Sequence, residues 1–262
     1  MSKQAGPLAE QLMANLLNNP ALVAVWDFQE EAGKPRLSQG KQIYTLQEMS
    51  AEPIQRVEEG ILGDYSARLE FGQWLNLPRK DCPELNFSGA SSDLTIVAWV
   101  KRSEREDRGC QAVAGMWNES KKQRQYCMFL DLQIWDSKDQ IGGHVSAIGG
   151  PTPGYKYCMT TALGSTAVSK EEWHCLAFTY DGTFARCYLD GKLDEREGFN
   201  PYLYEGGLFD GGEDGADFTV GAVDRSGVPG NFYSGLLGGL AVFNRALSEQ
   251  QIADLQRFMP KA

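Results

Sequence analysis

The sequence predicts an all-β protein, a sandwich of two antiparallel sheets with one short helix at each end. Three observations support this prediction. β-branched and aromatic runs recur along the 262 residues, turn clusters of Gly and Pro separate them, and no helical periodicity lies between them. The length suits a single all-β domain with a sizeable core. We therefore expect one domain, in which residues 1–20 form an N-terminal helical segment and residues 21–262 form the sandwich.

The N-terminal segment has the spacing of an amphipathic helix. Leu8, Leu12 and Leu16 recur every four residues, Pro7 suits a first helical turn, and the Asn-Asn-Pro at 18–20 suits a helix end. Such an apolar stripe needs a partner. That partner is either the sandwich itself or another protein chain.

Strand-like runs begin at residue 21 with the sequence ALVAVWDF. The further runs that we expect to form strands are 67–77, 94–100, 126–135, 144–148, 173–180, 184–189, 217–222 and 236–243. Trp26, Trp99 and Trp173 lie within these patterns, and we expect them in the core.

Two Asp-Gly pairs, at 181–182 and 190–191, predict two successive hairpins, because this dipeptide tolerates the positive φ of tight turns. A two-residue first turn would pair Cys175 with Tyr188 and point the thiols of Cys175 and Cys187 to opposite faces; a three-residue turn would bring them to one face. The six cysteines include no C-x-x-C pair. We expect free, mostly buried thiols in a reducing compartment and no zinc site.

The C-terminal segment carries a helix start signal. Ser248 is a good N-cap, Gln251 follows three residues later, and apolar residues flank the pair, which is the pattern of a capping box with a hydrophobic staple. The sequence predicts a final helix of about ten residues, with Ile252, Leu255 and Met259 on one side.

The charge of the chain argues against two classes of partner. With 25 Lys and Arg against 35 Asp and Glu, the formal net charge is -10, which repels phosphate backbones and anionic membrane surfaces. No segment approaches the roughly 18 apolar residues of a membrane span, and the N-terminus lacks the apolar stretch of a signal peptide. We expect no nucleic-acid and no membrane partner, and a cytoplasmic protein as written, or a secreted one if an export signal precedes it.

Several segments together resemble the laminin-G-like members of the concanavalin A-like lectin/glucanase superfamily. They are VWDFQE at 25–30, LTIVAWV at 94–100, WH at 173–174 with FTYDG at 178–182, YLDGK at 188–192 and SGLLGGLAVFNRALS at 234–248. Their order and spacing also match, over residues 21–262. The resemblance implies a jelly-roll sandwich with one concave sheet and variable loops around its rim. It implies no single activity, because members include sugar-binding modules and adhesion domains, and related sandwiches carry catalysis.

The resemblance also raises calcium as a cofactor. Many relatives carry an acidic pair where this chain has Gly238 and Gly239, and an aspartate-rich loop where it reads GKPRLS at 33–38. Those acids often help to hold a structural calcium ion, and of such residues Asp27 and Glu30 remain here. The acidic loop at 210–217 lacks the alternating pattern of a calcium loop. We therefore expect no cofactor, with calcium as the alternative.

Motifs for catalysis are missing from the sequence. Glycoside hydrolysis needs two carboxylates roughly 5–9 Å apart, and the Glu-x-Asp-x-x-Glu strand of the related glucanases does not occur. His174 occupies the common Trp-His of the family strand, where we expect a structural role. Neither a Gly-x-Ser-x-Gly elbow nor a Cys-His motif is present. The sequence predicts no catalytic residue, and a glycoside hydrolase or lyase would need an atypical site.

The predicted loops offer better material for binding. Sugar sites on sandwiches combine aromatic faces with polar groups that orient the hydroxyls. The candidates are Trp117, Asn118, His144, Tyr155, Tyr157, Asp224, Arg225, Asn231 and Tyr233. They predict a non-catalytic, lectin-like module with a glycan partner. A protein-interaction domain is the alternative, motivated by the N-terminal helix and by the absence of a signal peptide. Residues 149–169 are long enough to cover the concave face, which would close such a site.

Overall fold

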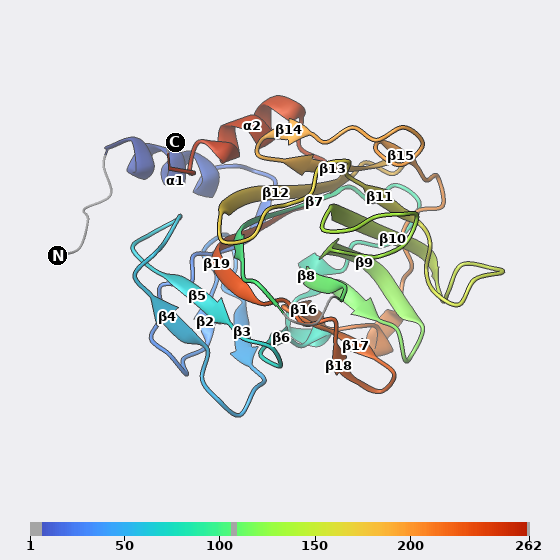
Figure 1. Ribbon diagram of the computed structural model, residues 1–262, viewed down its shortest axis with the longest axis horizontal. Coiled ribbons are helices and arrows are strands. Elements are labelled where there is room, and N and C mark those ends of the chain that lie inside the picture. The colour runs from blue at the N-terminus through green and yellow to red at the C-terminus, as the bar shows by residue number, and fades with distance from the viewer. Residues whose placement is uncertain (1–6, 106–108, 261–262) are drawn as a thin grey trace.

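The computed structural model describes residues 7–105 and 109–260, and it confirms the two-sheet antiparallel sandwich (Figure 1). One sheet, the β7 sheet, has nine strands in the described residues. Along its main path the order is β14 (Lys192–Leu193), β13 (Phe184–Leu189), β12 (Trp173–Tyr180), β7 (Leu94–Arg102), β19 (Gly235–Phe243), β5 (Ser66–Leu69) and β4 (Gln55–Val57), with β1 (Leu22–Trp26) beside β19 and β15 (Tyr202–Leu203) beside β13.

The other sheet, the β9 sheet, has ten strands in the same part of the chain. Its main path is β11 (Thr161–Leu163), β10 (Ile141–Gly149), β9 (Gln123–Leu130), β8 (Gln111–Asn118), β16 (Phe218–Val220), β6 (Leu75–Leu77), β3 (Thr45–Glu48) and β2 (Arg36–Leu37). The hairpin of β17 (Val223–Arg225) and β18 (Val228–Gly230) joins at β8. Three short 3-10 turns, Arg79–Asp81, Pro83–Leu85 and Gly212–Asp214, lie in the loops.

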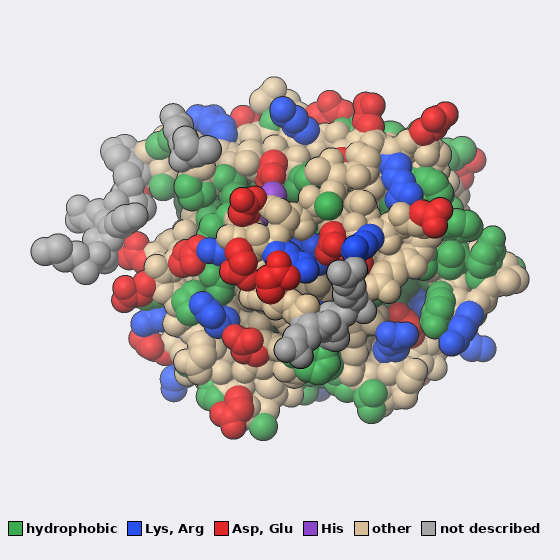
Figure 2. All heavy atoms as spheres, in the orientation of Figure 1, with side chains coloured by type: hydrophobic (Ala, Val, Ile, Leu, Met, Phe, Trp, Pro, Cys, Tyr) green, Lys and Arg blue, Asp and Glu red, His purple; other side chains and the backbone are tan. Residues whose placement is uncertain are grey.

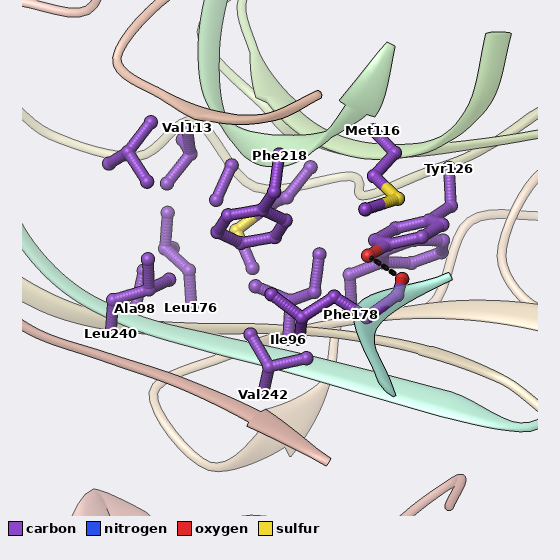
Figure 3. Close-up of a cluster of buried hydrophobic side chains, with 14 of the residues drawn as sticks. Ile96, Ala98, Val113, Met116, Tyr126, Leu176, Phe178, Phe218, Leu240 and Val242 are labelled. Carbon is purple, nitrogen blue, oxygen red and sulfur yellow. Dashed lines mark hydrogen bonds between the residues drawn. The ribbon is translucent and has the colours of Figure 1, made fainter. Parts of the chain in front are cut away.

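The core fills the space between the sheets because alternate side chains of each strand point inward. From the β7 sheet these include Ile96, Ala98, Leu176, Phe178, Leu240 and Val242, and they face Val113, Met116, Tyr126 and Phe218 of the β9 sheet (Figure 3). The hydroxyl of the buried Tyr126 donates to the carbonyl of Leu85 at 2.7 Å. The predicted core positions of Trp26 and Trp99 are confirmed. Trp173 instead is partly exposed, and its Nε1 donates to Glu59.

Two helices cover the outer face of the β7 sheet, α1 (Pro7–Leu17) and α2 (Glu249–Gln256) (Figure 1). Leu16 of α1 and Ile252 of α2 are buried in one apolar cluster with Trp99 and Phe243 of the sheet. The stripe of the N-terminal helix therefore packs on its own chain. The predicted capping box at Ser248 is present. Among the described residues, no helix has the length and hydrophobicity that crossing a membrane requires.

The first Asp-Gly hairpin differs from its predicted register. The Asp181 carboxylate accepts hydrogen bonds from the backbone N–H groups of Thr183 and Phe184, which closes a longer loop over residues 181–184, and Tyr180 pairs with Ala185. This shift is two residues, an even number, so it preserves the face of each side chain. Cys175 therefore lies in the outer cluster and Cys187 in the core, and the six cysteines are free.

The predicted strand at 67–77 is wrong as a single element. It is two strands in different sheets, β5 and β6. A turn separates them, in which Gln73 bonds the backbone of Glu70 and Gly72 adopts a φ of +91°. Glycine has no Cβ to oppose this φ, so the chain can cross from one sheet to the other at this point.

Candidate functional site

Three aromatic rings gather on the outer face of the β9 sheet. On β9 the side chains alternate, so that Tyr126 and Met128 enter the core while Cys127 and Phe129 point away from it. His144 of β10 and Trp117 of β8 lie on this same outer face. The Trp117 and His144 ring centroids are 5.0 Å apart, and Phe129 stands edge-on to both, at 5.9 Å from Trp117 and 5.4 Å from His144. We refer to these three residues as the aromatic cluster.

The glycines before His144 explain why β10 fits here. A Cβ at Gly143 would overlap the ring of Phe178 in the core, and one at Gly142 would overlap the end of Leu132 above the outer face. Both sides of β10 are therefore filled by side chains from other elements at these positions. The Gly-Gly pair is a packing requirement that sets β10 close to both layers.

A pocket of about 380 Å³ opens beside the aromatic cluster. Its lining residues are Gly109, Cys110, Trp117, Glu119, Arg124, Phe129, Leu132, Gln133, Ile134, His144, Tyr157, Cys158, Arg225 and Asn231. The walls come from the segments after β9, after β10 and around the β17–β18 hairpin. The volume lies near the lower end of the roughly 300–1,000 Å³ of small-molecule sites, which suits a short saccharide.

Five of the nine predicted binding residues line this pocket: Trp117, His144, Tyr157, Arg225 and Asn231. They come from three strands and two loops, so only the folded sheet brings them together. Whether they bind a ligand stays a prediction.

The other four predicted residues are not among those that line the pocket. The Asn118 side chain accepts from the N–H of Lys121 in the β8–β9 turn, and the Asp224 carboxylate accepts from the hydroxyl of Ser120. Tyr155 packs edge-on against Trp135, with ring centroids 5.9 Å apart. For Tyr233 we expected a loop position that a ligand can reach. Its side chain is instead fully buried in the core, where its hydroxyl donates to Leu236.

Several lining residues were not predicted. Phe129 lies inside a strand, and Glu119 and Arg124 flank the β8–β9 turn. Residues 126–130 form an unbroken apolar run, and because side chains alternate along a strand, such a run makes both faces of β9 apolar. This run is the sequence signal that could have identified Phe129. An apolar outer face must be covered by other residues or must line a site.

His144 is held as a neutral hydrogen-bond acceptor. Burial lowers the pKa of its imidazole to about 4, so the ring is uncharged at neutral pH. Its Nδ1 lies 3.0 Å from the carbonyl oxygen of Thr160, which can only accept, so Nδ1 carries the proton. Nε2 therefore keeps its lone pair and makes no hydrogen bond to the described residues.

Trp117 contributes an unpaired donor. Its side chain is only 2% exposed, and Nε1 finds no acceptor in the described part of the chain. A buried donor left without a partner costs about 1–3 kcal/mol.

Cationic side chains lie in and beside the pocket. Arg124 bonds the carbonyl of Gly149 and lies 3.9 Å from the Glu119 carboxylate, while Arg225 is exposed. Lys156 lies over the ring of Tyr157, 5.1 Å from its centroid. Hydrogen bonding to Lys156 and its charge, followed by Arg225, lower the pKa of the Tyr157 hydroxyl.

This concentration of cations is local. On the face of the molecule seen in Figure 2, acidic and basic side chains are interspersed, with no single basic patch.

The backbone around the pocket takes several left-handed conformations. Gln133 and Asn231 both line the pocket with φ near +55°, at +57° and +54°. Ser226 and Gly227 have φ of +57° and +83° and form the two-residue turn that carries Arg225 at its base. Non-glycine residues in this region cost energy, and such residues cluster at binding sites.

The segment 149–169 does not close the pocket. Thr152 and Tyr157 pair within it as a tight loop, and Trp135 Nε1 donates to the carbonyl of Met159, which ties it to the neighbouring loop. Tyr157 and Cys158 then form one wall of the pocket.

One arrangement has the order of a nucleophilic triad. His174 Nε2 lies 2.7 Å from the Ser169 hydroxyl, and its Nδ1 lies 2.8 Å from the Asp190 carboxylate. However, the Ser169 hydroxyl also donates to the Glu172 carboxylate at 2.6 Å, and it has one hydrogen to give. Because that hydrogen points to Glu172, it is not directed at His174 Nε2, so the histidine is not placed to take it. These contacts tie the 169–172 turn to the Asp-Gly turn at 190–191, which agrees with a structural role for His174.

The acidic loop at 210–217 contacts a buried arginine of this chain, Arg79. Asp217 accepts from the backbone of Arg79 at 2.8 Å and Asp210 lies 3.3 Å from the Arg79 guanidinium. No group of three or more His, Cys, Asp or Glu side chains suited to a metal ion occurs among the described residues.

Solved structures with a similar fold include proteins named for glycans. The Botulinum neurotoxin serotype D ligand binding domain, in complex with N-acetylneuraminic acid, is 11% identical with a TM-score of 0.57, over 94% of this chain and 52% of that one. Trypanosoma rangeli sialidase in complex with sialic acid is 14% identical with a TM-score of 0.60, over 92% and 33%. The chain thus spans about half of the neurotoxin domain and a third of the sialidase. At these identities the likeness shows the fold alone.

One similar structure is smaller, and the match covers nearly all of it. The CBM40 of Ruminococcus gnavus IT-sialidase, bound to alpha2,3 sialyllactose, is 15% identical with a TM-score of 0.52, over 73% of this chain and 96% of that one. A comparison with curated proteins finds no match. The family model described as the concanavalin A-like lectin/glucanases superfamily matches residues 74–253, well over half of the sequence. This chain therefore belongs to the concanavalin A-like lectin/glucanase superfamily.

Proposed function

We propose that this protein is a non-catalytic carbohydrate-binding module that holds a short saccharide in the pocket beside the aromatic cluster. The observation that carries the proposal is one pocket lined by the rings of Trp117, Phe129 and His144, in which His144 Nε2 is a free hydrogen-bond acceptor. A sugar presents apolar C–H faces and hydroxyl groups that both donate and accept. Similar structures bound to sialic acid and sialyllactose support a glycan as the kind of ligand.

The alternatives have less support. The protein-interaction hypothesis rested on an apolar helix in need of a partner, and α1 packs on its own sheet. A glycoside hydrolase needs two carboxylates across the sugar. Among the described residues that line the pocket, only Glu119 carries a carboxylate, and Arg124 lies beside it.

The test is a glycan-array screen with and without calcium, followed by calorimetry on each hit. Tyr157→Ala should weaken binding by about tenfold, equivalent to about 1.4 kcal/mol, because Tyr157 lines the pocket. Tyr155→Ala is the matched control: this tyrosine is also exposed, two residues away in the same loop, and lies outside the pocket lining. Equal effects of the two variants, or no saturable binding with or without calcium, would contradict the proposal.

A further inference from the structure

We infer that the pocket selects a saccharide that bears a carboxylate, and that Arg225 is the residue that reads this charge. The inference rests on the proposed function and narrows it to one class of ligand.

Arg225 has binding capacity that the fold leaves unused. Its Nη1 donates to the side-chain oxygen of Asn231 at 3.0 Å, and hydrogen bonding from Arg225 also helps to lower the pKa of the Tyr157 hydroxyl. Among the described residues, no carboxylate lies at ion-pair distance from its guanidinium. A guanidinium carries five N–H donors in a planar fork that matches a carboxylate. Arg225 can therefore bind an incoming carboxylate without first leaving an acidic partner.

The second arginine of the pocket is already engaged. Arg124 is almost fully buried, donates to the carbonyl of Gly149 at 3.3 Å and lies 3.9 Å from Glu119. It offsets the negative charge of Glu119, so the pocket is not acidic. The net charge of the lining side chains is then set by Arg225.

Neighbouring groups at the mouth add donors of the same kind. Asn231 accepts from Arg225 through its oxygen, which leaves its amide N–H groups to donate. Lys156 lies over the ring of Tyr157, 5.1 Å from its centroid, and adds a second cation. A positive mouth on a chain of net charge -10 is a local feature, and it favours an anion over a neutral sugar.

The inner part of the pocket suits uncharged groups. His144 supplies a lone pair because its other nitrogen bonds Thr160, and Trp117 and Phe129 offer apolar ring surface. A ligand with hydroxyl groups at one end and a carboxylate at the other fits this pocket, with the hydroxyl groups on the inside and the carboxylate near Arg225. An acidic monosaccharide or the acidic end of a glycan has this chemistry.

Calorimetry with matched sugars tests the inference. The probes are D-galacturonate against D-galactose, D-glucuronate against D-glucose, and 3′-sialyllactose against lactose, each at low and at physiological salt. We expect at least one acidic sugar to bind about tenfold or more tightly than its neutral partner, with the preference weakening as salt rises. Arg225→Gln should abolish the preference, and Arg225→Lys should retain part of it, because lysine keeps the charge without the planar fork.

The matched control is Arg245→Gln. Arg245 is also an exposed arginine, 72% accessible, and it lies beside Asp93 outside the pocket lining, so its loss should leave the preference unchanged. Equal binding of acidic and neutral sugars, or a preference that survives Arg225→Gln, would overturn the inference and leave the proposed function standing. Failure of every sugar, acidic and neutral, would overturn both.

Discussion

The buried His144 should make the stability of this protein depend on pH. The imidazole has a pKa of about 4 in the folded chain against 6.5 for an unperturbed histidine, because burial disfavours its charged form. Between these two values the unfolded chain binds more protons than the folded chain, so stability rises with pH. His144 thus contributes its full stabilisation above pH 6.5, and the contribution is lost as the pH falls toward 4.

The size of this effect follows from the shift. One pKa unit corresponds to 1.36 kcal/mol, so a shift from 6.5 to about 4 makes the folded state about 3 kcal/mol less stable at pH 4 than at pH 7 from this residue alone. Carboxylates also titrate in this range, so the wild-type protein alone does not isolate the histidine. A variant without His144 does.

The assay is urea unfolding followed by tryptophan fluorescence at pH 7 and pH 4. His144→Asn keeps an amide N–H for the Thr160 carbonyl and does not titrate, so its loss of stability between the two pH values should be about 3 kcal/mol smaller than that of the wild type. His174→Gln removes the other histidine and serves as the control. If wild type and His144→Asn lose the same free energy, or if the His144 proton resonance titrates near pH 6.5, the neutral acceptor assigned to this residue is refuted.

Two further predictions concern the fold that carries the site. Gly143→Ala should lower the free energy of unfolding by about 1–3 kcal/mol, since its Cβ would overlap the ring of Phe178. Gly142→Ala meets the flexible side-chain ends of Leu132 and Leu163 and should cost less, and denaturant midpoints of the two variants would reveal any reversal of that order. Ser248→Ala removes the α2 capping box and should cost about 1 kcal/mol, a fall of about 2–4 °C in Tm that Ser248→Asp restores; an unchanged Tm in the alanine variant would mean that α2 adds nothing to stability.

Much of the fold could be predicted from local patterns. The hairpin strands Trp173–Tyr180 and Phe184–Leu189 were predicted with their observed bounds, because alternating apolar residues end at Asp-Gly turns. The α2 start at Ser248 followed from a signal of only six residues. The failures also have local causes. The Asp181 carboxylate captures two backbone N–H groups and lengthens the turn, and a turn at Gly72 sends one predicted strand into two sheets.

The site was less accessible to such reasoning. Tyr157 and Tyr233 are alike in sequence, each a tyrosine in a polar, glycine-containing segment, yet one lines the pocket and the other is buried in the core. The difference lies in what packs over each segment, which depends on residues far away in the chain.

The sequence by itself determined the class of fold, the terminal helices and the residue types available for binding, because alternation, turn chemistry and capping act over a few residues. Only the tertiary structure decided where a pocket forms. Trp117, Phe129 and His144 meet because three strands pair in one register with these side chains on the outer face. A register shift of one residue would turn the side chains of a strand into the core, and that register is set by packing across the whole sandwich.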